Sequence, residues 1–330
     1  MPIAVSTVDY HTAGEPFRIV TGGVRELRGR TILEKRRDAL ENLDDVRRLL
    51  IYEPRGHADM YGCFVTEPED EGADLGAVFF HNEGYSTACG HGTIALVTWA
   101  LESGRLPGPA SGEAEVVVDV PSGRLPCVAR CRDGRVESVS FRNVPSFVVA
   151  TGLVVEDVPL DLAYGGAFYA SVDVRELGLC VAAADLPRLI DLQRRVRPAI
   201  EGAVDVAHPL EPELRGVYGV IFFQDESGDS GLTQRNVTVF ADGEVDRSPC
   251  GSGTSARLAL LHAAGRLAVA EPLRHLSIVD TEFVGRLVGT TEVADRPAVV
   301  TEVEGTAYPT GRHEFVLAPD DPLKTGFLLR

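Results

Sequence analysis

Two cysteines occupy matching positions in a stretch that the chain contains twice. Cys89 opens the run Cys-Gly-His-Gly-Thr and Cys250 opens Cys-Gly-Ser-Gly-Thr, and both runs continue over equal lengths to a closing Gly-Arg-Leu at 104–106 and 265–267. A segment nearly free of charge follows each cysteine, which predicts a buried helix. The first turn of a helix offers amide groups and the positive end of the dipole, which stabilise a thiolate and a nearby anion. The repeat therefore predicts two thiols in equivalent surroundings.

Two such thiols suit one reaction on a carbon acid. A thiolate removes a proton from one face while a thiol returns a proton to the other face, which inverts the stereocentre. The Cα of an amino acid is such a centre, and charge that develops on its carboxylate is stabilised by preorganised donors. The two thiols would titrate as a coupled pair, one charged and one neutral in the active form. The amides expected to bind the carboxylate are those of Gly90, His91, Gly251 and Ser252.

Two polar residues close to the cysteines are suited to holding the substrate nitrogen. His91 lies two residues after Cys89, and Asp246 lies four residues before Cys250. The plainer interpretation makes His91 a helix-start residue and Asp246 a turn residue, and it stays open. The duplicated cysteines favour the functional interpretation.

The elements around these residues also occur twice. Apolar spacing predicts amphipathic helices over 32–50 and 186–200, the second ended early by Pro198. The pattern of 160–168 repeats that of 8–16, and the remaining segments alternate as short strands joined by turns. We expect an α/β (α+β) chain of two pseudo-symmetric domains. Residues 1–151, joined by a strand from about 318–330, would form the first, and 152–317 the second.

Each domain is expected to wrap a mostly antiparallel, barrel-like sheet around its cysteine helix. A helix that is apolar on most sides must be covered by its own strands. We expect the two helix N-termini to face a shared cleft, because small-molecule sites favour domain interfaces.

Composition narrows the class of partner. The net charge of -17 and the pI near 4.9 argue against a nucleic-acid or membrane surface, so a small-molecule partner is expected. The sequence has neither a signal-peptide pattern at its start nor an apolar run long enough for a membrane span, which predicts a cytoplasmic protein with free thiols. No C-x-x-C or H-x-x-x-H pair is present, so no metal site is expected.

Four segments resemble the signature segments of the proline racemase family: 246–254, 89–92, 11–16 and 53–57. The resemblance runs from about Val5 to Phe327. It implies a fold like that of diaminopimelate epimerase, no cofactor and often a homodimer. By the same resemblance, Cys89 and Cys250 would be the acid/base pair, with His91 and Asp246 near the substrate nitrogen.

The subclass depends on conflicting features. Dehydratases of the family usually carry Thr where this chain has Cys250, so the second thiol favours an isomerase, a 4-hydroxyproline 2-epimerase or proline racemase. The segments 81–86 and 162–169 and the C-terminal segment look more like the trans-3-hydroxy-L-proline dehydratase branch, which is the alternative. Tyr61 corresponds to an aromatic pocket wall in the family, where its hydroxyl is suited to bind a ring hydroxyl. It is equally explained as an ordinary core residue.

Two other functional classes stay open. A thiol oxidoreductase would need a resolving partner close to its reactive thiol, and the special cysteines lie in separate domains. A non-catalytic amino-acid-binding module would keep the cleft, yet both thiols and Asp246 are retained. An imino-acid isomerase is therefore the first expectation.

Overall fold

The computed structural model describes residues 3–228 and 231–329. Their contacts form two compact units: unit 1 comprises the residues up to Val139 and those from Thr306 on, and unit 2 is Ser140–Gly305. The sequence analysis places these boundaries later, at 151/152 and 317/318. The difference has a simple cause. Strand β8 (Ser146–Val155) pairs with strands of unit 2, whereas β17 (Ala307–Leu317) pairs along its whole length with β1 of unit 1.

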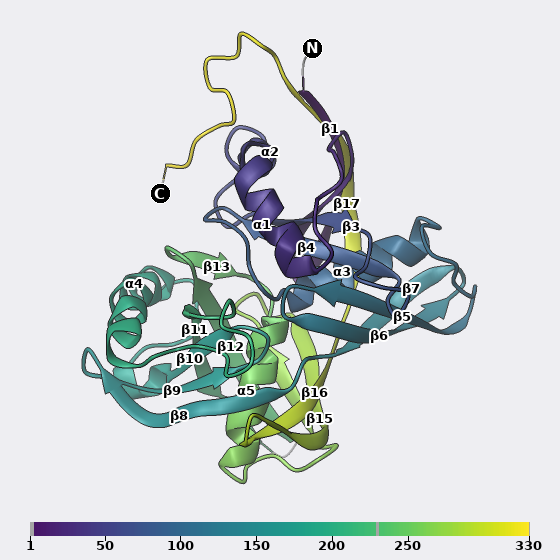
Figure 1. Cartoon of the computed structure of the whole chain (residues 1–330). Coiled ribbons are helices and arrows are strands. Elements are labelled where there is room, and N and C mark those ends of the chain that lie inside the picture. The colour runs from purple at the N-terminus through teal and green to yellow at the C-terminus, as the bar shows by residue number, and fades with distance from the viewer. Residues whose placement is uncertain (1–2, 229–230, 330) are drawn as a thin grey trace. The chain divides into compact units, whose positions relative to one another are not determined.

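Unit 1 is built on the sheet order β17-β1-β2-β3-β4-β5-β6 (Figure 1). Its strands are β1 (Ile3–Thr12), β2 (Glu15–Gly22), β3 (Tyr61–Thr66), β4 (Leu75–His81), β5 (Gly112–Val120) and β6 (Gly123–Arg132), besides β17. Its helices are α1 (Ile32–Asn42), α2 (Asp44–Ile51) and α3 (Gly90–Glu102). Strand β7 (Arg135–Arg142) crosses the boundary into unit 2.

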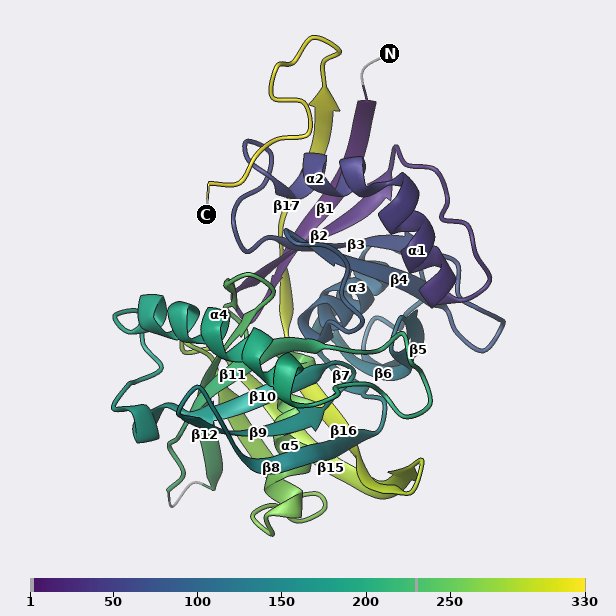
Figure 2. The same ribbon diagram turned by 60° about the vertical axis from the view of Figure 1, so that its left-hand side comes forward.

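Unit 2 contains a closed barrel of eight strands in the order β8-β9-β10-β11-β12-β14-β15-β16, with β16 returning to β8. Its further strands are β9 (Val158–Tyr164), β10 (Phe168–Asp173), β11 (Val217–Asp225), β12 (Leu232–Phe240), β13 (Glu244–Asp246), β14 (Pro272–Leu276), β15 (Glu282–Val293) and β16 (Arg296–Gly305). Its helices are η1 (Val174–Leu177), α4 (Leu186–Ala203) and α5 (Gly251–Ala263). Helix α5 runs inside the strands and α4 lies on their outer side (Figure 2).

The strand pairings confirm the internal duplication. From β17 to β6 the successive pairs are antiparallel, antiparallel, parallel, antiparallel, parallel and antiparallel. From β8 to β15 the pairs follow the same order. The expectation of mostly antiparallel, barrel-like sheets is therefore confirmed, with two parallel pairs in each unit.

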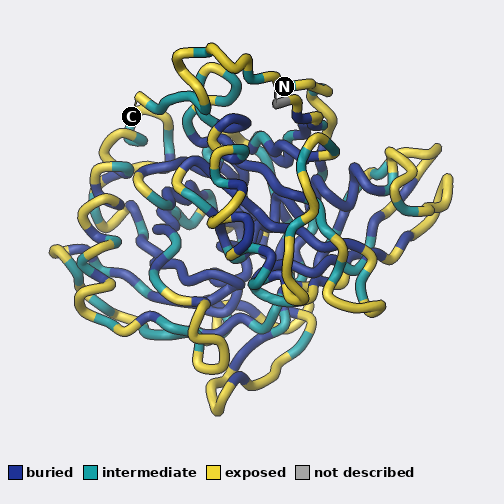
Figure 3. Tube along the Cα trace, turned by 45° about the horizontal axis from the view of Figure 1, so that its top comes forward, coloured by how far each residue is buried: buried dark blue, intermediate teal, exposed yellow. Residues whose placement is uncertain are grey.

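The two cysteine helices are the cores of their units, as their composition predicts. Every residue from Gly90 to Ala100 in α3 is buried, and so is every residue from Gly251 to Leu261 in α5. Burying a Leu or Ile side chain contributes about 1.5–3 kcal/mol, so these helices anchor both units. The burial-coloured trace shows a dark interior and exposed hairpin turns (Figure 3). One charged residue, Arg257, is buried in α5, with its guanidinium over the Phe223 ring.

Two local predictions were wrong. The segment 32–50 forms two helices rather than one, because the helical conformation is interrupted at Leu43. Asp44 and Asp45 then lie in the first turn of a second helix, where negative charge is stabilising. Helix α4 continues through Pro198 to Ala203. Burial of Ile200, two residues further on, offsets the backbone hydrogen bond that a proline removes. Within the described residues, no helix is long and apolar enough to cross a membrane.

Candidate active site

In unit 1, the Cys89 sulfur lies at the start of α3 among polar groups. Cys89 is the N-cap residue of the helix, and its sulfur accepts the Gly92 N–H at 3.3 Å. The His91 ring is close, with Nε2 3.3 Å from the sulfur. An amide donor and an imidazole within contact distance stabilise a thiolate at this position. The Thr12 hydroxyl donates to the His91 carbonyl at 2.9 Å and ties this first turn to β1.

The third residue of each cysteine helix must be glycine because the sulfur occupies the space of a side chain. A Cβ on Gly92 would lie 2.7 Å from the Cys89 sulfur and 2.4 Å from the Phe17 ring. A Cβ on Gly253 would lie 2.9 Å from the Cys250 sulfur. The repeated Cys-Gly-x-Gly pattern is therefore a packing requirement of a sulfur folded over its own helix.

Tyr61 lies on the Cys89 side, at the start of β3. Its ring meets the His91 ring edge to face at a centroid distance of 4.9 Å, and its hydroxyl donates to the Ser86 hydroxyl at 2.5 Å. Tyr61 is 2% exposed and Ser86 is 3% exposed. The hydrogen-bonded Tyr61 and Ser86 hydroxyls are thus linked to the Cys89 site through the contact between the Tyr61 and His91 rings.

In unit 2, the Cys250 sulfur lies among hydroxyl groups. The Tyr169 hydroxyl is 3.8 Å from the sulfur and hydrogen-bonds the Ser252 hydroxyl at 2.6 Å. Cys250 packs in the same apolar cluster as Tyr169 and Ile221. This second thiol is as buried as Cys89, and its side-chain hydrogen-bonding partners are neutral hydroxyls.

The surroundings of Cys250 favour the protonated thiol. Burial, together with the negative charge of Asp246, raises the pKa of Cys250 to about 12, against the lowering effects of the Gly253 amide and the Tyr169 hydroxyl. Asp246 is the last residue of β13, is 4% exposed, and accepts the Ser248 N–H at 2.8 Å. The free protein is thus expected to carry Cys250 as a neutral acid.

Replacing Asp246 by asparagine is expected to lower the pKa of Cys250, because the substitution removes the negative charge that disfavours the thiolate. More thiolate at pH 8 means faster alkylation, by about threefold or more for a shift of half a unit. The measurement is the rate of iodoacetamide labelling of the Cys250 peptide by mass spectrometry, in a Cys180→Ser background because Cys180 is exposed. Asp242→Asn, at a largely exposed carboxylate nearby, is the matched control. An unchanged or slower rate in Asp246→Asn would contradict this account.

The predicted site residues fall into two groups. Cys89, Gly90, His91 and Tyr61 lie together in unit 1, and Cys250, Gly251, Ser252 and Asp246 lie together in unit 2. Gly90 and Gly251 begin their helices, as the repeat predicts. The shared cleft stays a prediction.

The sequence analysis missed the role of Tyr169. Residue 169 follows the segment 160–168, which repeats the pattern of 8–16, so its counterpart in the first half is Phe17. Both aromatic rings contact the residue two positions after the cysteine: Phe17 packs on His91, and Tyr169 hydrogen-bonds Ser252. Extending the repeat by one residue would have identified this position.

No group of three or more His, Cys, Asp or Glu side chains suited to a metal ion occurs in residues 3–228 and 231–329. All six cysteines lie within these ranges and are free thiols. The polar groups of the two sites are instead thiols, hydroxyls, amides, one imidazole and one carboxylate.

Several curated proteins are similar to this chain over its whole length. Trans-3-hydroxy-L-proline dehydratase of Bacillus thuringiensis subsp. konkukian is 47% identical over 329 residues, covering 98% of each chain. The protein of the same name from Azospirillum brasilense is 45% identical over 332 residues, covering 99% of this chain and 98% of its own.

Solved structures show the same architecture. A hydroxyproline epimerase from Agrobacterium vitis, with bound trans-4-hydroxy-L-proline, has a TM-score of 0.91 at 33% identity and covers 99% of this chain and 96% of its own. A PhzF-family protein from Bacillus anthracis has a TM-score of 0.58 at 14% identity, covering 95% of this chain and 99% of its own, and shares the fold alone.

The family model for proline racemase matches residues 7–328. That span includes both cysteine helices and both units that hold them. With two buried cysteines at helix N-cap positions in a duplicated α/β fold, and with full-length relatives named as enzymes of hydroxyproline, the chain belongs to the proline racemase family.

Proposed function

We propose that this chain removes the Cα proton of a hydroxylated proline and that its principal reaction is dehydration of trans-3-hydroxy-L-proline. The observation that carries the proposal is Cys89 at the N-cap of α3, with an amide donor and the His91 ring at its sulfur, in a chain 45–47% identical to full-length proteins named for this reaction. The sequence analysis ranks epimerisation first, and these relatives reverse that order.

The stereochemistry of this substrate explains why one thiolate suffices. In trans-3-hydroxy-L-proline the 3-hydroxyl is trans to the carboxylate, so it lies on the same ring face as the Cα hydrogen. The thiolate of Cys89 takes the Cα proton, the C3–O bond breaks, and a double bond forms between Cα and C3. A proton joins the departing hydroxide to give water, and the enamine tautomerises to the cyclic imine. The base and the group that binds the departing hydroxyl therefore act on the same face of the substrate ring. We propose that both come from unit 1.

The Tyr61 and Ser86 hydroxyls are the candidates for binding the departing 3-hydroxyl. They hydrogen-bond each other, and the Tyr61 ring contacts the His91 ring, whose Nε2 lies 3.3 Å from the Cys89 sulfur. The 3-hydroxyl offers this hydroxyl pair a further hydrogen bond that plain proline cannot make, and a hydrogen bond contributes about 0.5–1.5 kcal/mol. We therefore expect a preference for hydroxyproline over proline, and equal kcat/KM for both would contradict it.

A second reaction, 2-epimerisation of 4-hydroxyproline, is favoured by Cys250. The second thiol, held protonated by burial and by Asp246, is suited to return a proton to the opposite face of Cα. The structural relative with bound trans-4-hydroxy-L-proline agrees with this chemistry. A 4-hydroxyl is not on a carbon adjacent to Cα, so its loss cannot follow from the same carbanion, and reprotonation is the remaining outcome.

Proton NMR in D2O with separate hydroxyproline substrates tests both reactions. Loss of the 3-hydroxyl and growth of a cyclic imine from trans-3-hydroxy-L-proline supports dehydration. Deuterium at Cα with a growing epimer from trans-4-hydroxy-L-proline supports epimerisation. The Cys89→Ser protein is the control for exchange without catalysis. Absence of both products, and of Cα exchange in L-proline, overturns the proposal in favour of a binding module.

Mild oxidation is expected to join Cys89 to Cys250 and abolish activity, with substrate protecting. The proposal requires both sulfurs to approach one carbon, and two thiols that close can form a disulfide. The measurement is peptide mapping and residual activity after treatment with diamide, in the Cys180→Ser background. Oxidation that joins these two residues while turnover continues would contradict the shared site.

A further inference from the structure

The two cysteines differ in backbone conformation although their helices are repeats. Cys89 is extended, with φ −153° and ψ 97°. Cys250 has φ 62° and ψ 101°, in the region that only glycine adopts readily. A strained residue persists only where the surrounding structure holds it in that conformation.

Three hydrogen bonds hold the Cys250 backbone. Its N–H donates to the Ser248 hydroxyl at 3.0 Å. Its carbonyl accepts the Thr254 N–H at 2.7 Å and the Thr254 hydroxyl at 2.8 Å. Thr93 makes the same hydroxyl bond to the Cys89 carbonyl at 2.9 Å in unit 1. The hydrogen bond from the threonine hydroxyl to the cysteine carbonyl is therefore part of the repeat. The two units differ in the residue that contacts the threonine hydroxyl from the other side.

Behind Thr254 lies His275. The ring nitrogen Nδ1 of His275 is 2.8 Å from the Thr254 hydroxyl oxygen. That hydroxyl has one hydrogen and two carbonyl acceptors, Cys250 at 2.8 Å and Pro249 at 3.4 Å. We therefore assign the proton of the His275–Thr254 pair to Nδ1, which donates to the hydroxyl oxygen. The result is a directed chain: His275 Nδ1–H to Thr254 Oγ1–H to the Cys250 carbonyl. Among the described residues, no histidine is recorded as hydrogen-bonded to Thr93.

The surroundings of His275 preserve this one tautomer. Burial, with a smaller effect of the Arg257 charge, lowers the pKa of His275 to about 3, so the ring is neutral and has one N–H. The other nitrogen, Nε2, is buried without a hydrogen-bond partner in the part of the chain that the structure describes. A buried imidazole with one unsatisfied nitrogen is unfavourable, which indicates that the bond made by Nδ1 is what this position serves.

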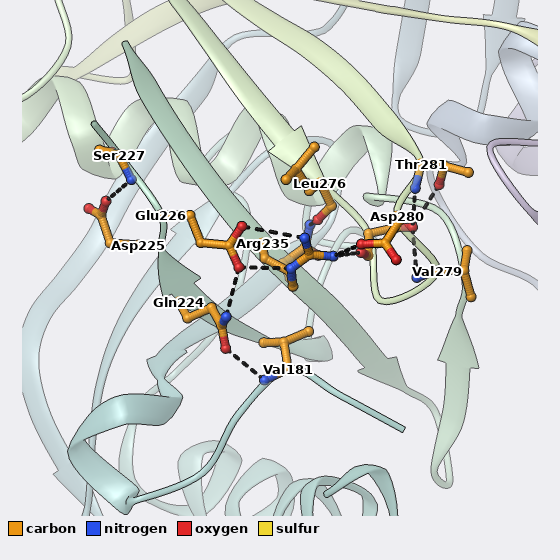
Figure 4. A network of polar contacts seen from close by, with 12 residues as sticks. Val181, Gln224, Asp225, Glu226, Ser227, Arg235, Leu276, Val279, Asp280 and Thr281 are labelled. Atoms are coloured by element: carbon orange, nitrogen blue, oxygen red, sulfur yellow. Dashed lines mark hydrogen bonds and ion pairs between the residues drawn. The ribbon is translucent and has the colours of Figure 1, made fainter. Parts of the chain in front are cut away.

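The strands around His275 are also held in place. His275 lies on β14, in register with Gln234 of β12. On the next residue of β12, the Arg235 side chain bonds Glu226 at 2.8 Å, Asp280 at 2.6 Å and the Ser277 carbonyl at 3.0 Å (Figure 4). This network ties β12 to the loop that follows β14, so the imidazole is presented to Thr254 from a fixed support.

We propose that His275 is a positioning residue for Cys250, which it holds through Thr254 in the left-handed conformation that sets the direction of the thiol. The inference rests on the proposed function in one respect: an oriented second thiol matters for returning a proton to Cα. It therefore bears on epimerisation more than on a dehydration that uses Cys89 as its base.

The test compares His275→Leu with His275→Asn in the Cys180→Ser background. Leucine removes the donor, whereas the asparagine amide can place an N–H near the position of Nδ1 and restore the hydrogen bond to Thr254. We expect His275→Leu to lower the ratio of epimerisation to dehydration by about tenfold or more, less than the roughly 100- to 10,000-fold that a positioned acid itself contributes, because His275 acts on Cys250 through Thr254. We expect His275→Asn to stay within about threefold of the parent ratio. Equal ratios in both variants, with both folded, overturn the proposal.

A second readout does not depend on any substrate. Iodoacetamide labelling of Cys250, followed by mass spectrometry, should be at least about threefold faster in His275→Leu than in His275→Asn, because a released sulfur leaves its buried position. If the protein turns over no hydroxyproline, the proposed function fails, and the labelling rate of Cys250 still tests the positioning role of His275. If His275→Leu does not fold, the same comparison is made at Thr254, the middle residue of the hydrogen-bond series, with Thr254→Val and Thr254→Ser. Equal labelling of Cys250 in these two variants overturns the proposal.

Discussion

Replacing Cys89 by alanine is expected to abolish both dehydration and epimerisation, whereas replacing Cys250 by threonine is expected to abolish epimerisation alone. Positioned acid/base groups contribute about 100- to 10,000-fold, so we expect the Cys89→Ala protein to lose at least about 1000-fold in kcat for either reaction. The asymmetry follows from the two sites. Both sulfurs are buried beside an amide, but the His91 ring lies 3.3 Å from the Cys89 sulfur, whereas the negative charge of Asp246 adds to burial in keeping Cys250 protonated.

The measurement is the rate of imine formation from trans-3-hydroxy-L-proline and of epimer formation from trans-4-hydroxy-L-proline. Cys250→Thr should keep imine formation within about tenfold, since a syn elimination uses one base on one face. Cys63→Ala, at a buried thiol that takes no part in either site, is the control for general effects of removing a core sulfur. Equal losses of imine formation in the two catalytic variants would show that both thiols act in dehydration.

Gly92→Ala is expected to inactivate the protein and to lower its melting temperature. The added methyl would lie 2.7 Å from the Cys89 sulfur and 2.4 Å from the Phe17 ring, closer than van der Waals contact allows. Overpacking in a core costs about 1–3 kcal/mol, and here the atoms that must move include the reactive sulfur. We expect a loss of about 100-fold or more in kcat, comparable to losing a positioned base.

Gly253→Ala is the counterpart in unit 2, where the methyl would lie 2.9 Å from the Cys250 sulfur and 3.1 Å from Ile221. It should impair epimerisation more than dehydration. Gly202→Ala is the matched control, because nothing lies within 4 Å of its Cβ at the end of α4, and alanine is the better helix former by up to about 1 kcal/mol. Activity in Gly92→Ala equal to that in Gly202→Ala would refute the packing argument.

The duplicated motif predicted much of the architecture in advance. A buried helix after each cysteine follows from a run nearly free of charge, and the structure confirms both helices. The barrel-like sheets follow from the need to cover such helices, and the matched strand pairings of the two units confirm the repeat. The position of each cysteine at the start of its helix was also predicted, whereas the role of the glycines in making room for the sulfur emerged only from the structure.

Local errors came from features that short-range patterns do not encode. Pro198 was expected to end α4, but burial of Ile200, two residues further on, outweighed the lost backbone hydrogen bond. The domain boundaries were placed by punctuation in the sequence, whereas pairing of β8 and β17 with distant strands decides where each belongs.

The sequence by itself determined which residues could do the chemistry: two thiols at helix starts, an imidazole, a carboxylate and the glycines beside them. Only the tertiary structure distinguished the two thiols. Burial and Asp246 raise the pKa of Cys250, and His275 reaches its backbone through Thr254 from a strand more than twenty residues away in the chain. Desolvation and hydrogen bonding depend on three-dimensional neighbours, so a repeat that looks symmetric in sequence becomes two unequal sites in the folded protein.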